Sequence, residues 1–496
     1  MVLLRGEGDS LETFWVRRSE TVSYMPGFRA FPGGNVNRED ATLEIEGLDE
    51  GQERTLRACL VREAFEETGI LLTRSAPGGD LERARARLLA GEVLFPELAR
   101  EHGWRFRADT LTPAGRWVSP AFAALRFETT FFLARVPWDQ KPSVLPGELE
   151  SGEWVSPIVA LQRWQAGNET FAAPLLYTLI ALAEGEKGLA ERMSGYPETH
   201  GHPVRRIELK WGIVLHPMKT RPLPPATHTN AYLVGDREMA LIDPGSDDPE
   251  ELKRLFDLVE LLASDDRHVK LVLLTHHHPD HVAGLAAVRK RYGAKVAAHA
   301  ETARHVNVDF TLADGDVVPL APGKADWTLR ALHTPGHTRG HLCFLHPRTG
   351  SLFTGDHVTG AGTVIIDPPE GDMAQYVRSL ERLLNEPLTT LFPAHGSPQA
   401  AARRRIQGLI AHRLERETKV VAALAAGAAA PRELVERAYQ DTPRDLWGYA
   451  ERSLLAHLIK LESEGRARRD GERWVGAESA TGAAATTPPS ESGSRA

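Results

Sequence analysis

The sequence predicts a multidomain chain in which α/β and α+β domains follow one another. A chain of 496 residues is too long for one hydrophobic core, and such a length favours about two to four domains. Short apolar segments that end in polar residues alternate with helical segments over residues 207–410, a pattern typical of a layered α/β domain. Near the end of the chain, helical segments precede a hairpin pattern, which indicates a small helical module with a two-stranded wing.

The first domain is expected to span residues 1–190. Its best strand candidate is residues 127–136, which are rich in aromatic and β-branched side chains, and its clearest helix covers residues 52–67. Further expected elements are an extended segment at 11–16, a tight turn at Pro32-Gly33-Gly34, and helices at 157–165 and 174–185. A polar, irregular stretch at 185–203 predicts the boundary with the next domain.

The central domain is expected over residues 205–415 and a third domain over residues 416–475. Predicted central strands cover 231–234, 239–243, 270–275, 295–299, 329–333 and 351–356. The third domain has predicted helices at 432–439 and 445–464 and a hairpin around Asp470-Gly471. Residues 476–496, rich in Ala, Ser, Thr, Pro and Gly, are expected to form a disordered tail.

Composition narrows the class of protein. With 42% hydrophobic and 25% charged residues, and no apolar run long enough to cross a bilayer, we expect no membrane partner. Cys59 and Cys343 lie in apolar stretches, so we predict buried free thiols and a cytoplasmic location. A net charge of −8 argues against bulk nucleic acid as the main partner, although a local basic groove stays open.

The strongest motif is Thr275-His-His-His-Pro-Asp-His281, which follows a predicted strand at residues 269–274. His276 and His278 are two positions apart and can converge on one ion, whereas Asp280 and His281 follow the proline and point to a neighbouring position. Imidazole nitrogen and carboxylate oxygen are donors that zinc prefers, and a hydrolytic zinc keeps one position open for water. Because these donors cannot complete two ions alone, others must come from elsewhere.

Three other segments supply such donors after a strand and a Gly/Pro turn. They place His337, Asp356 and His395 at strand ends. Asp243 is a plausible carboxylate for orienting a histidine, while His228 and His341 are candidates for contact with substrate. His277 is expected to point away. Other histidines lack this arrangement of strand and Gly/Pro turn and are expected at the surface or in packing contacts: His216, His268, His299, His305, His346 and His412.

The pattern His-x-His-x-Asp-His at residues 276–281 resembles the metallo-β-lactamase superfamily. The resemblance implies an αββα sandwich with two zinc ions. Asp280 would also have a catalytic role, by holding and orienting the attacking water. The implied ligands are His276, His278 and His337 for one ion, Asp280, His281 and His395 for the other, and Asp356 as a bridge.

The resemblance extends to residues 226–234, residues 355–363 and the C-terminal winged helix. Over residues 207–475 the chain is similar to the lactamase-beta-like subgroup that includes mitochondrial endoribonucleases, which makes an RNA phosphodiester a candidate substrate. Thioester and lactone hydrolases use the same metal site, so the site does not select the substrate. The winged helix either binds nucleic acid through Arg466, Arg468, Arg469 and Arg473, or it packs within the protein or forms a homodimer.

In the first domain, Glu63, Glu66 and Glu67 share one face of the predicted helix. Three carboxylates at this spacing repel one another unless a cation lies between them, and such hard oxygen donors suit Mg²⁺ or Mn²⁺. Gly69 is expected to end the helix in a left-handed conformation, so that Ile70–Leu72 begin a strand. Without the residues around it, this group of glutamates would be interpreted as an acidic helix face exposed to solvent.

Together with Arg62 and the Phe31-Pro-Gly-Gly34 turn, this helix resembles the Nudix hydrolase box. The family implies an α/β/α fold and diphosphate cleavage, with Glu66 and Glu67 as metal ligands, Glu63 as a further ligand or catalytic base, and Arg62 structural. Additional ligand candidates are Glu148 and, as runner-up, Glu150. The 27 residues between Gly34 and Arg62 exceed the usual spacing, and Arg54 stands at the mid-box glutamate position. A similar long insertion occurs in the branch that includes coenzyme A diphosphatases.

The sequence therefore predicts a two-site metallo-hydrolase. The zinc centre would cleave a phosphodiester, RNA included, or a thioester, and the Nudix domain a small nucleotide such as coenzyme A. The alternative is a single-site thioesterase or glyoxalase-like zinc hydrolase, in which the Nudix and winged-helix parts bind ligand or nucleic acid.

Overall fold

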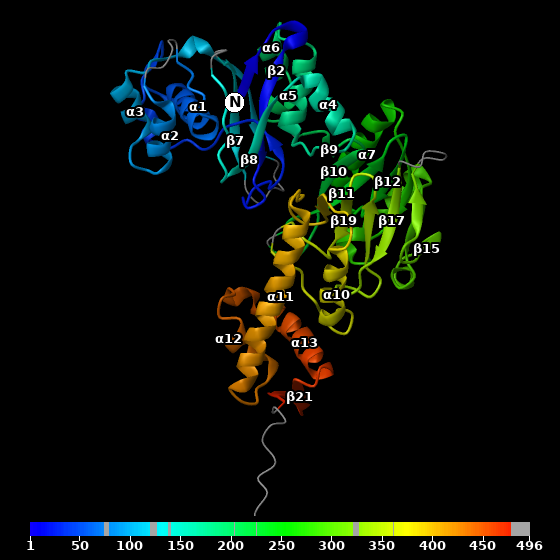
Figure 1. Ribbon diagram of the computed structural model, residues 1–496. Helices are drawn as coiled ribbons and strands as arrows, with labels where there is room; N and C mark the ends of the chain where they lie inside the picture. Colours follow the sequence, from blue (N-terminus) through cyan, green and yellow to red (C-terminus); the bar gives the residue numbers. More distant parts are fainter. Residues whose placement is uncertain are drawn as a thin grey trace, which may run out of the picture. The chain divides into compact units, whose positions relative to one another are not determined.

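The computed structural model describes residues 1–73, 79–119, 126–136, 140–202, 204–224, 226–320, 327–360 and 362–477 (Figure 1). The chain forms two compact units. One comprises Met1–Thr334, Gly340–Thr363 and Leu383–Ile406, and the other Pro335–Arg339, Val364–Arg382 and residues from Gln407 on. Within the described ranges, no helix combines the length and the apolar character that a membrane span requires.

The first domain is built on a six-stranded sheet whose main order is β3-β2-β1-β7-β6, with β8 paired to β2. The strands are β1 (Val2–Arg5), β2 (Glu12–Arg18), β3 (Arg29–Ala30), β6 (Leu111–Val118), β7 (Glu128–Arg135) and β8 (Leu149–Val155). A separate two-stranded sheet joins β4 (Ile45–Glu46) and β5 (Phe106–Arg107). The helices are α1 (Gln52–Thr68), α2 (Leu81–Leu89), α3 (Phe95–His102), α4 (Pro157–Gln165), α5 (Ala173–Ala183) and α6 (Leu189–Ser194).

Alternating side chains of the first sheet fill two separate cores, which gives the α/β/α layering. Leu3 and Phe14 pack with Phe65 of α1 on one face. Val2 and Trp15 pack with the α4–α5 region on the other face. Successive strand residues point to opposite faces, so one strand serves both layers.

Most sequence predictions for this domain are confirmed, and two are wrong. The stretch at 185–203, expected to be irregular, contains the helix α6. Gly69 ends α1 with φ of 72°, as expected. Residues 70–72, however, form no strand, although they are buried. The Gln140 side chain takes the place of a partner strand, because it accepts a hydrogen bond from Leu71 N and donates one to Leu71 O, both at 2.8 Å.

The central domain consists of two sheets. The seven-stranded sheet has the order β15-β14-β13-β12-β11-β10-β9 and the five-stranded sheet the order β16-β17-β18-β19-β20. The first contains β9 (Ile207–Lys210), β10 (Ile213–Lys219), β11 (His228–Gly235), β12 (Glu238–Ile242), β13 (His268–Leu273), β14 (Lys295–His299) and β15 (Phe310–Leu312). The second contains β16 (Val317–Pro319), β17 (Thr328–His333), β18 (Leu342–His346), β19 (Ser351–Gly355) and β20 (Thr390–Pro393).

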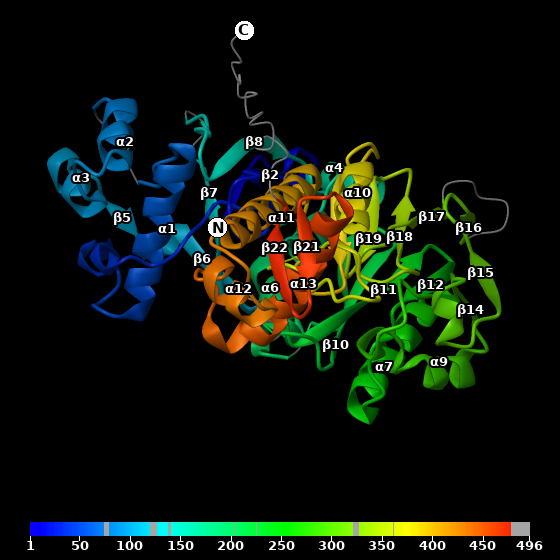
Figure 2. The ribbon, with the colours of Figure 1, turned by 90° about the horizontal axis from the view of Figure 1, so that it is seen from below.

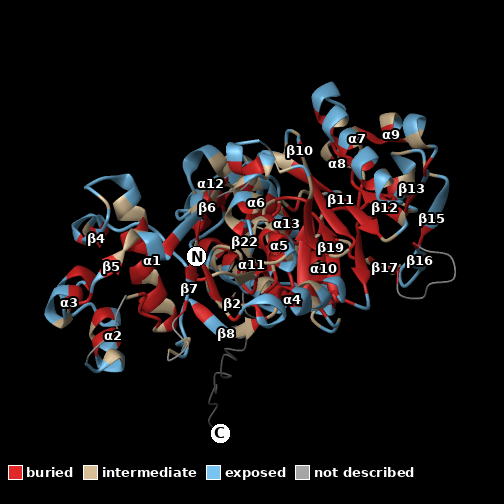
Figure 3. Ribbon diagram, turned by 90° about the horizontal axis from the view of Figure 1, so that it is seen from above, coloured by how far each residue is buried: buried red, intermediate tan, exposed pale blue. Residues whose placement is uncertain are grey.

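The two central sheets face each other across one core. Tyr232 of the larger sheet meets Phe353 and Phe392 of the smaller one. On the outer face of the larger sheet, α7 (Pro249–Ser264) and α9 (Leu285–Tyr292) cover a second core. Figure 3 shows the strands buried and these helices exposed on one side. The fold class is therefore the expected sandwich of sheets between helices. Cys59 and Cys343 are buried, as predicted, and form no disulfide within the described part of the chain.

The C-terminal module contains α12 (Pro431–Ala438), α13 (Trp447–Ser463) and the hairpin β21 (Ala467–Asp470) with β22 (Arg473–Gly476). Its core combines apolar residues of α12, α13 and the hairpin with Val420 and Leu424 of α11 (Ala402–Ala425) (Figure 2). The helix pair and wing confirm the predicted winged helix. The expected domain boundary at residue 415 falls inside α11, and residues 478–496 of the expected tail lie outside the described ranges.

Candidate metal centre

The motif histidines follow β13 at the edge where parallel strands end together. β12 and β13 pair in parallel, with Ile242 opposite Leu273, so Asp243 emerges beside the segment that begins the motif. The short helix α8 (Pro279–Val282) then carries Asp280 and His281, and the His281 side chain is fully buried. The second sheet contributes in the same way, because β19 and β20 pair in parallel and are followed by Asp356 and His395.

Asp243 holds the start of the motif. Its Oδ1 accepts a hydrogen bond from Thr275 N at 2.8 Å, and its Oδ2 accepts one from Thr275 Oγ1 at 2.6 Å. The same Oδ2 lies 2.9 Å from Nδ1 of His281. Asp243 has φ of 51°, a left-handed conformation that Asp tolerates better than most residues. The predicted orienting role of Asp243 thus has a structural basis, because the carboxylate fixes the ring and leaves Nε2 of His281 directed to the centre.

Residues of β11 hold His395 and its loop in place. Its Nδ1 lies 2.9 Å from the carbonyl oxygen of His228. Asn230 steadies the same loop, since its Nδ2 donates to the carbonyl oxygens of Pro393 at 2.9 Å and Gly396 at 2.8 Å. Asn230 is not among the predicted site residues, although it lies within residues 226–234.

Asp280, His281, His395 and Asp356 converge. Nε2 of His395 lies 3.4 Å from Asp280 Oδ2 and 3.1 Å from Asp356 Oδ1. Nε2 of His281 lies 3.9 Å and 3.5 Å from the same two oxygens. One ligand atom each of Asp280, His281 and His395 lies within 4.8 Å of the others. The structure therefore brings together the residues that the sequence predicted for one ion, with Asp356 against them.

A second group of ligand atoms contains the donors predicted for the other ion. One atom each of His276, His278, His337 and Asp356 lies within 4.8 Å of the others. His276 Nε2 lies 2.9 Å from His278 Nδ1, and His276 Nδ1 lies 3.0 Å from Thr275 Oγ1. Nδ1 of His337 lies 3.0 Å from the carbonyl oxygen of Ile365. Asp356 belongs to this group and also contacts the other, as a bridging ligand would.

Burial and opposite charge act together on the centre. Burial alone would keep both imidazoles neutral, but the carboxylate of Asp356 holds the pKa of His281 well above its ordinary value and raises the pKa of His395 to about 10. Burial would raise the pKa of Asp280 and Asp356, and the two imidazoles outweigh it and lower both. A divalent cation would replace the imidazole protons and satisfy the same carboxylates, so the donor set fits zinc.

The other histidines of the region have mixed fates. His341, a candidate for substrate contact, is fully buried, and its Nδ1 lies 2.9 Å from Thr334 Oγ1. His277 stacks on His305, with ring centroids 4.0 Å apart. His346 is also fully buried and stacks on Trp327, in agreement with a packing role.

The carboxylates of α1 are arranged around Arg62 and the glycine turn. Arg62 Nη1 donates to Glu63 Oε1 and Glu66 Oε2, both at 2.8 Å, and its Nε donates to Asp40 Oδ1 at 2.7 Å. Glu67 Oε2 instead accepts from Gly33 N at 2.7 Å. Among the described residues, the groups with metal-ligand geometry do not include these three glutamates.

The glycine turn and the additional ligand candidates lie close to this helix. A Cβ on Gly34 would lie 2.4 Å from Glu63 Oε1, so the turn lies directly against the carboxylate end of this side chain. Glu148 pairs with Arg18 at 3.2 Å and Glu150 with Arg17 at 3.4 Å. Burial raises the pKa of both Glu63 and Glu67, and the negative charge of Glu148 adds to the effect, which places Glu148 near the acidic face.

Three protein families match separate parts of this chain. The metallo-beta-lactamase superfamily matches residues 224–395, the beta-lactamase associated winged helix domain residues 430–474, and the NUDT19 Nudix domain residues 51–182. A beta-lactamase-like protein 2 homolog of Drosophila melanogaster is 32% identical over 48% of this chain and 84% of that protein. An atrochrysone carboxyl ACP thioesterase of Aspergillus chevalieri is 30% identical over 44% of this chain and 70% of that protein.

Solved structures also match parts of the chain. A metallo-beta-lactamase family protein from Thermus thermophilus is 28% identical, with a TM-score of 0.44, over 53% of this chain and 98% of that one. A NUDIX hydrolase from Alicyclobacillus acidocaldarius is 27% identical, with a TM-score of 0.35, over 39% of this chain and 94% of that one.

Proposed function

We propose that this chain, which belongs to the metallo-β-lactamase superfamily, hydrolyses thioesters at a dinuclear zinc centre in its central domain. That it is a metal-dependent hydrolase follows from its metallo-β-lactamase and Nudix domains. The proposal adds the number and kind of ions, the bond that is cleaved and the roles of individual residues.

The convergence of Asp280, His281, His395 and Asp356 carries the proposal. His281 and His395 present Nε2 to the centre because their Nδ1 atoms are engaged by Asp243 Oδ2 and by the carbonyl oxygen of His228. Asp280 Oδ2 lies 3.4 Å from His395 Nε2, a position from which it can orient a water and accept its proton. Bound zinc would supply Lewis acidity and lower the pKa of water.

Thioester cleavage is favoured by the relatives rather than by the metal site. Relatives about 30% identical over this region carry the name atrochrysone carboxyl ACP thioesterase. A water oxygen would attack the carbonyl carbon, the carbon–sulfur bond would break, and the thiol would leave with a proton. Arg466 and Arg473, the winged-helix cations proposed for RNA, are engaged within their own module by Glu417 and Glu433, at 2.7 Å and 2.8 Å. RNA cleavage is therefore the second outcome of the same screen.

For the first domain we propose a Mg²⁺- or Mn²⁺-dependent diphosphatase that acts on a nucleotide such as coenzyme A. The match to a Nudix domain over residues 51–182 supports it, as does the acidic face of α1 with Arg62 as its organiser. Glu67 and Glu66 would bind the ion, with Glu63 as a further ligand or base. Cytoplasmic location and dimerisation stay predictions.

The test is a substrate screen with paired variants. The purified chain is incubated with an acyl-coenzyme A, an acyl-carrier-protein thioester, RNA and coenzyme A, each with zinc or magnesium. Asp356→Asn should abolish thioester cleavage and spare coenzyme A cleavage, whereas Glu66→Gln should do the reverse. Asp265→Asn, an exposed control at the end of α7, should change neither. Thioester cleavage that survives Asp356→Asn, or RNA cleavage alone, would refute the proposal.

A further inference from the structure

A cavity of about 820 Å³ lies between the C-terminal part of the first domain and the larger central sheet. On one side its walls come from the end of β6, from Arg126 just before β7, and from residues between Pro197 and Arg205. On the other side they come from β9, β10, β11 and α7. A volume of this size is typical of sites for organic ligands.

His216 of β10 is a buried polar residue that lines this cavity. His216 is 9% exposed, and its Nε2 atom has no hydrogen-bond partner among the described residues. Burial lowers the pKa of His216 to about 4, so the ring is neutral and can donate one N–H. A buried polar atom without a partner is costly, and a ligand that accepts a hydrogen bond there would remove that cost.

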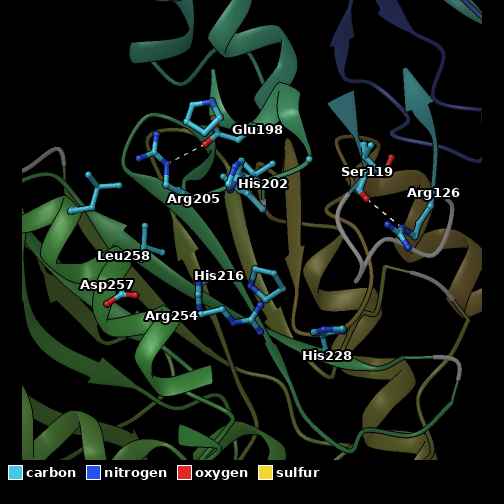
Figure 4. Close-up of a pocket in the computed structure, with 17 residues that line it drawn as sticks. Ser119, Arg126, Glu198, His202, Arg205, His216, His228, Arg254, Asp257 and Leu258 are labelled. Carbon is cyan, nitrogen blue, oxygen red and sulfur yellow. Dashed lines mark hydrogen bonds and ion pairs between the residues drawn. The ribbon is translucent and has the colours of Figure 1, made fainter. Parts of the chain in front are cut away.

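Three arginines line the same cavity. Arg254 lies beside His216, with Arg126 and Arg205 farther round the wall (Figure 4). Arg205 is paired with Glu198 at 3.3 Å, and Arg254 with Glu251. Arg126 contacts the carbonyl oxygen of Ser119 at 3.4 Å, and no carboxylate in the described part of the chain forms an ion pair with it.

Acidic and apolar residues also line the cavity. Glu198 and Asp257 are the acids of the wall, so three guanidinium groups face two carboxylates. Leu258, Ile207 and Val204 give the cavity an apolar side. A ligand that matches this lining has one anionic group and one apolar part.

We propose that this cavity binds an amphipathic organic anion, with its charged group against His216 and Arg254 and its apolar part against Leu258 and Ile207. The site is distinct from the metal centre. His228 lines the cavity and also meets His395 through its carbonyl oxygen. The proposal does not rest on the thioesterase function.

Two fluorescent dyes test the proposal, because they share the anilinonaphthalene group and differ by one anionic sulfonate. The probes are 8-anilino-1-naphthalenesulfonate and its neutral analogue N-phenyl-1-naphthylamine, titrated into the metal-loaded full chain. His216→Phe removes the donor and keeps an aromatic ring. It should weaken binding of the sulfonate at least about tenfold, since hydrogen bonds to charged groups contribute that much. Binding of the neutral dye should change less than about twofold.

A second cavity variant and a matched control complete the test. Arg254→Met, at an exposed helix position, should also weaken sulfonate binding selectively, by about two- to fivefold for a solvated charge. His268→Phe, an exposed histidine at the start of β13, is the matched control and should leave both titrations unchanged. Equal loss of both dyes, an effect of His268→Phe as large as that of His216→Phe, or undiminished sulfonate binding in both cavity variants would overturn the proposal.

Discussion

Asp243 and His281 form a carboxylate–imidazole pair at 2.9 Å, and the same Oδ2 atom accepts a hydrogen bond from Thr275 Oγ1. Asp243→Asn leaves one side-chain oxygen for three donors, so the orientation of His281 is lost. We expect metal affinity to fall about 10- to 100-fold, as it does when such orienting partners are removed. Zinc content of the purified variant after graded chelation, measured by mass spectrometry, checks this.

The matched control for this change is Asp266→Asn. Asp266 also has a positive φ, 61°, but it is exposed and outside the centre, so backbone effects of the Asp-to-Asn change are the same. Unchanged zinc retention in Asp243→Asn, or equal loss in both variants, would show that the pair does not hold the metal.

Gly245 is required by its close approach to Asp280. A Cβ at this position would lie 1.9 Å from the carbonyl oxygen of Asp280, which is backbone and cannot rotate away. Gly245→Ala should therefore displace Asp280 and cost about 1–3 kcal/mol in the free energy of unfolding, the range for overpacking. Urea denaturation measures the loss, and zinc content should drop with it. Gly408→Ala, on α11 with no atom within 4 Å of the added Cβ, should be neutral or stabilising.

The candidate ligands could be grouped from the sequence because they follow strands that end at common edges. Asp243 and the motif come after neighbouring parallel strands, as do Asp356 and His395, so convergence could be inferred from the strand pattern alone. The same pattern predicted an orienting role for Asp243, whose carboxylate contacts Thr275 and His281. Local patterning carries this information because strand direction decides on which edge a following residue lies.

Contacts between distant segments could not be predicted in this way. The bond between His395 and the His228 carbonyl, and the clamp of Asn230 on the His395 loop, join residues more than 160 positions apart. They depend on how two sheets pack, which no local pattern encodes. The strand expected at Ile70–Leu72 failed for a related reason, because the Gln140 side chain took the role of a neighbouring strand.

From the raised pKa of Glu67 we expect the metal affinity of the Nudix domain to depend on pH. Burial raises its pKa to about 8, only partly offset by the hydrogen bond from Gly33 N. Metal ions need the carboxylate, so below pH 8 a proton competes and Mn²⁺ affinity should fall by up to about tenfold per pH unit. Electron paramagnetic resonance of free Mn²⁺ measures this.

A variant pair isolates the Glu67 contribution. Glu67→Gln should remove the pH-dependent component of Mn²⁺ binding, whereas Glu44→Gln, exposed and outside the acidic face, should retain it. A wild-type Mn²⁺ affinity that stays constant as the pH falls from 8 would contradict the assignment of Glu67 as a ligand.

From the lowered pKa of Lys210 we expect the fold to become more stable at alkaline pH. This lysine of β9 is buried, and its Nζ donates to Thr389 Oγ1 at 3.0 Å. Burial lowers its pKa from 10.5 to about 8. Below pH 8 both the folded and unfolded chains hold the proton, and the buried charge destabilises the fold by a constant amount. Between pH 8 and 10.5 only the unfolded chain holds it, so the free energy of unfolding should rise with pH.

Lys210→Met removes this titration. Relative to the variant, the wild type should gain about 3 kcal/mol between the two pH values, since each unit of pKa shift corresponds to ~1.4 kcal/mol. Urea unfolding of both proteins at pH 8 and 10.5 gives the difference, in which other titrating groups cancel. Lys219→Met, an exposed lysine on the adjacent β10, should follow the wild type at both pH values. A gap between wild type and Lys210→Met that stays constant would mean that Lys210 keeps its proton in the fold, through its hydrogen bonds, as readily as in water.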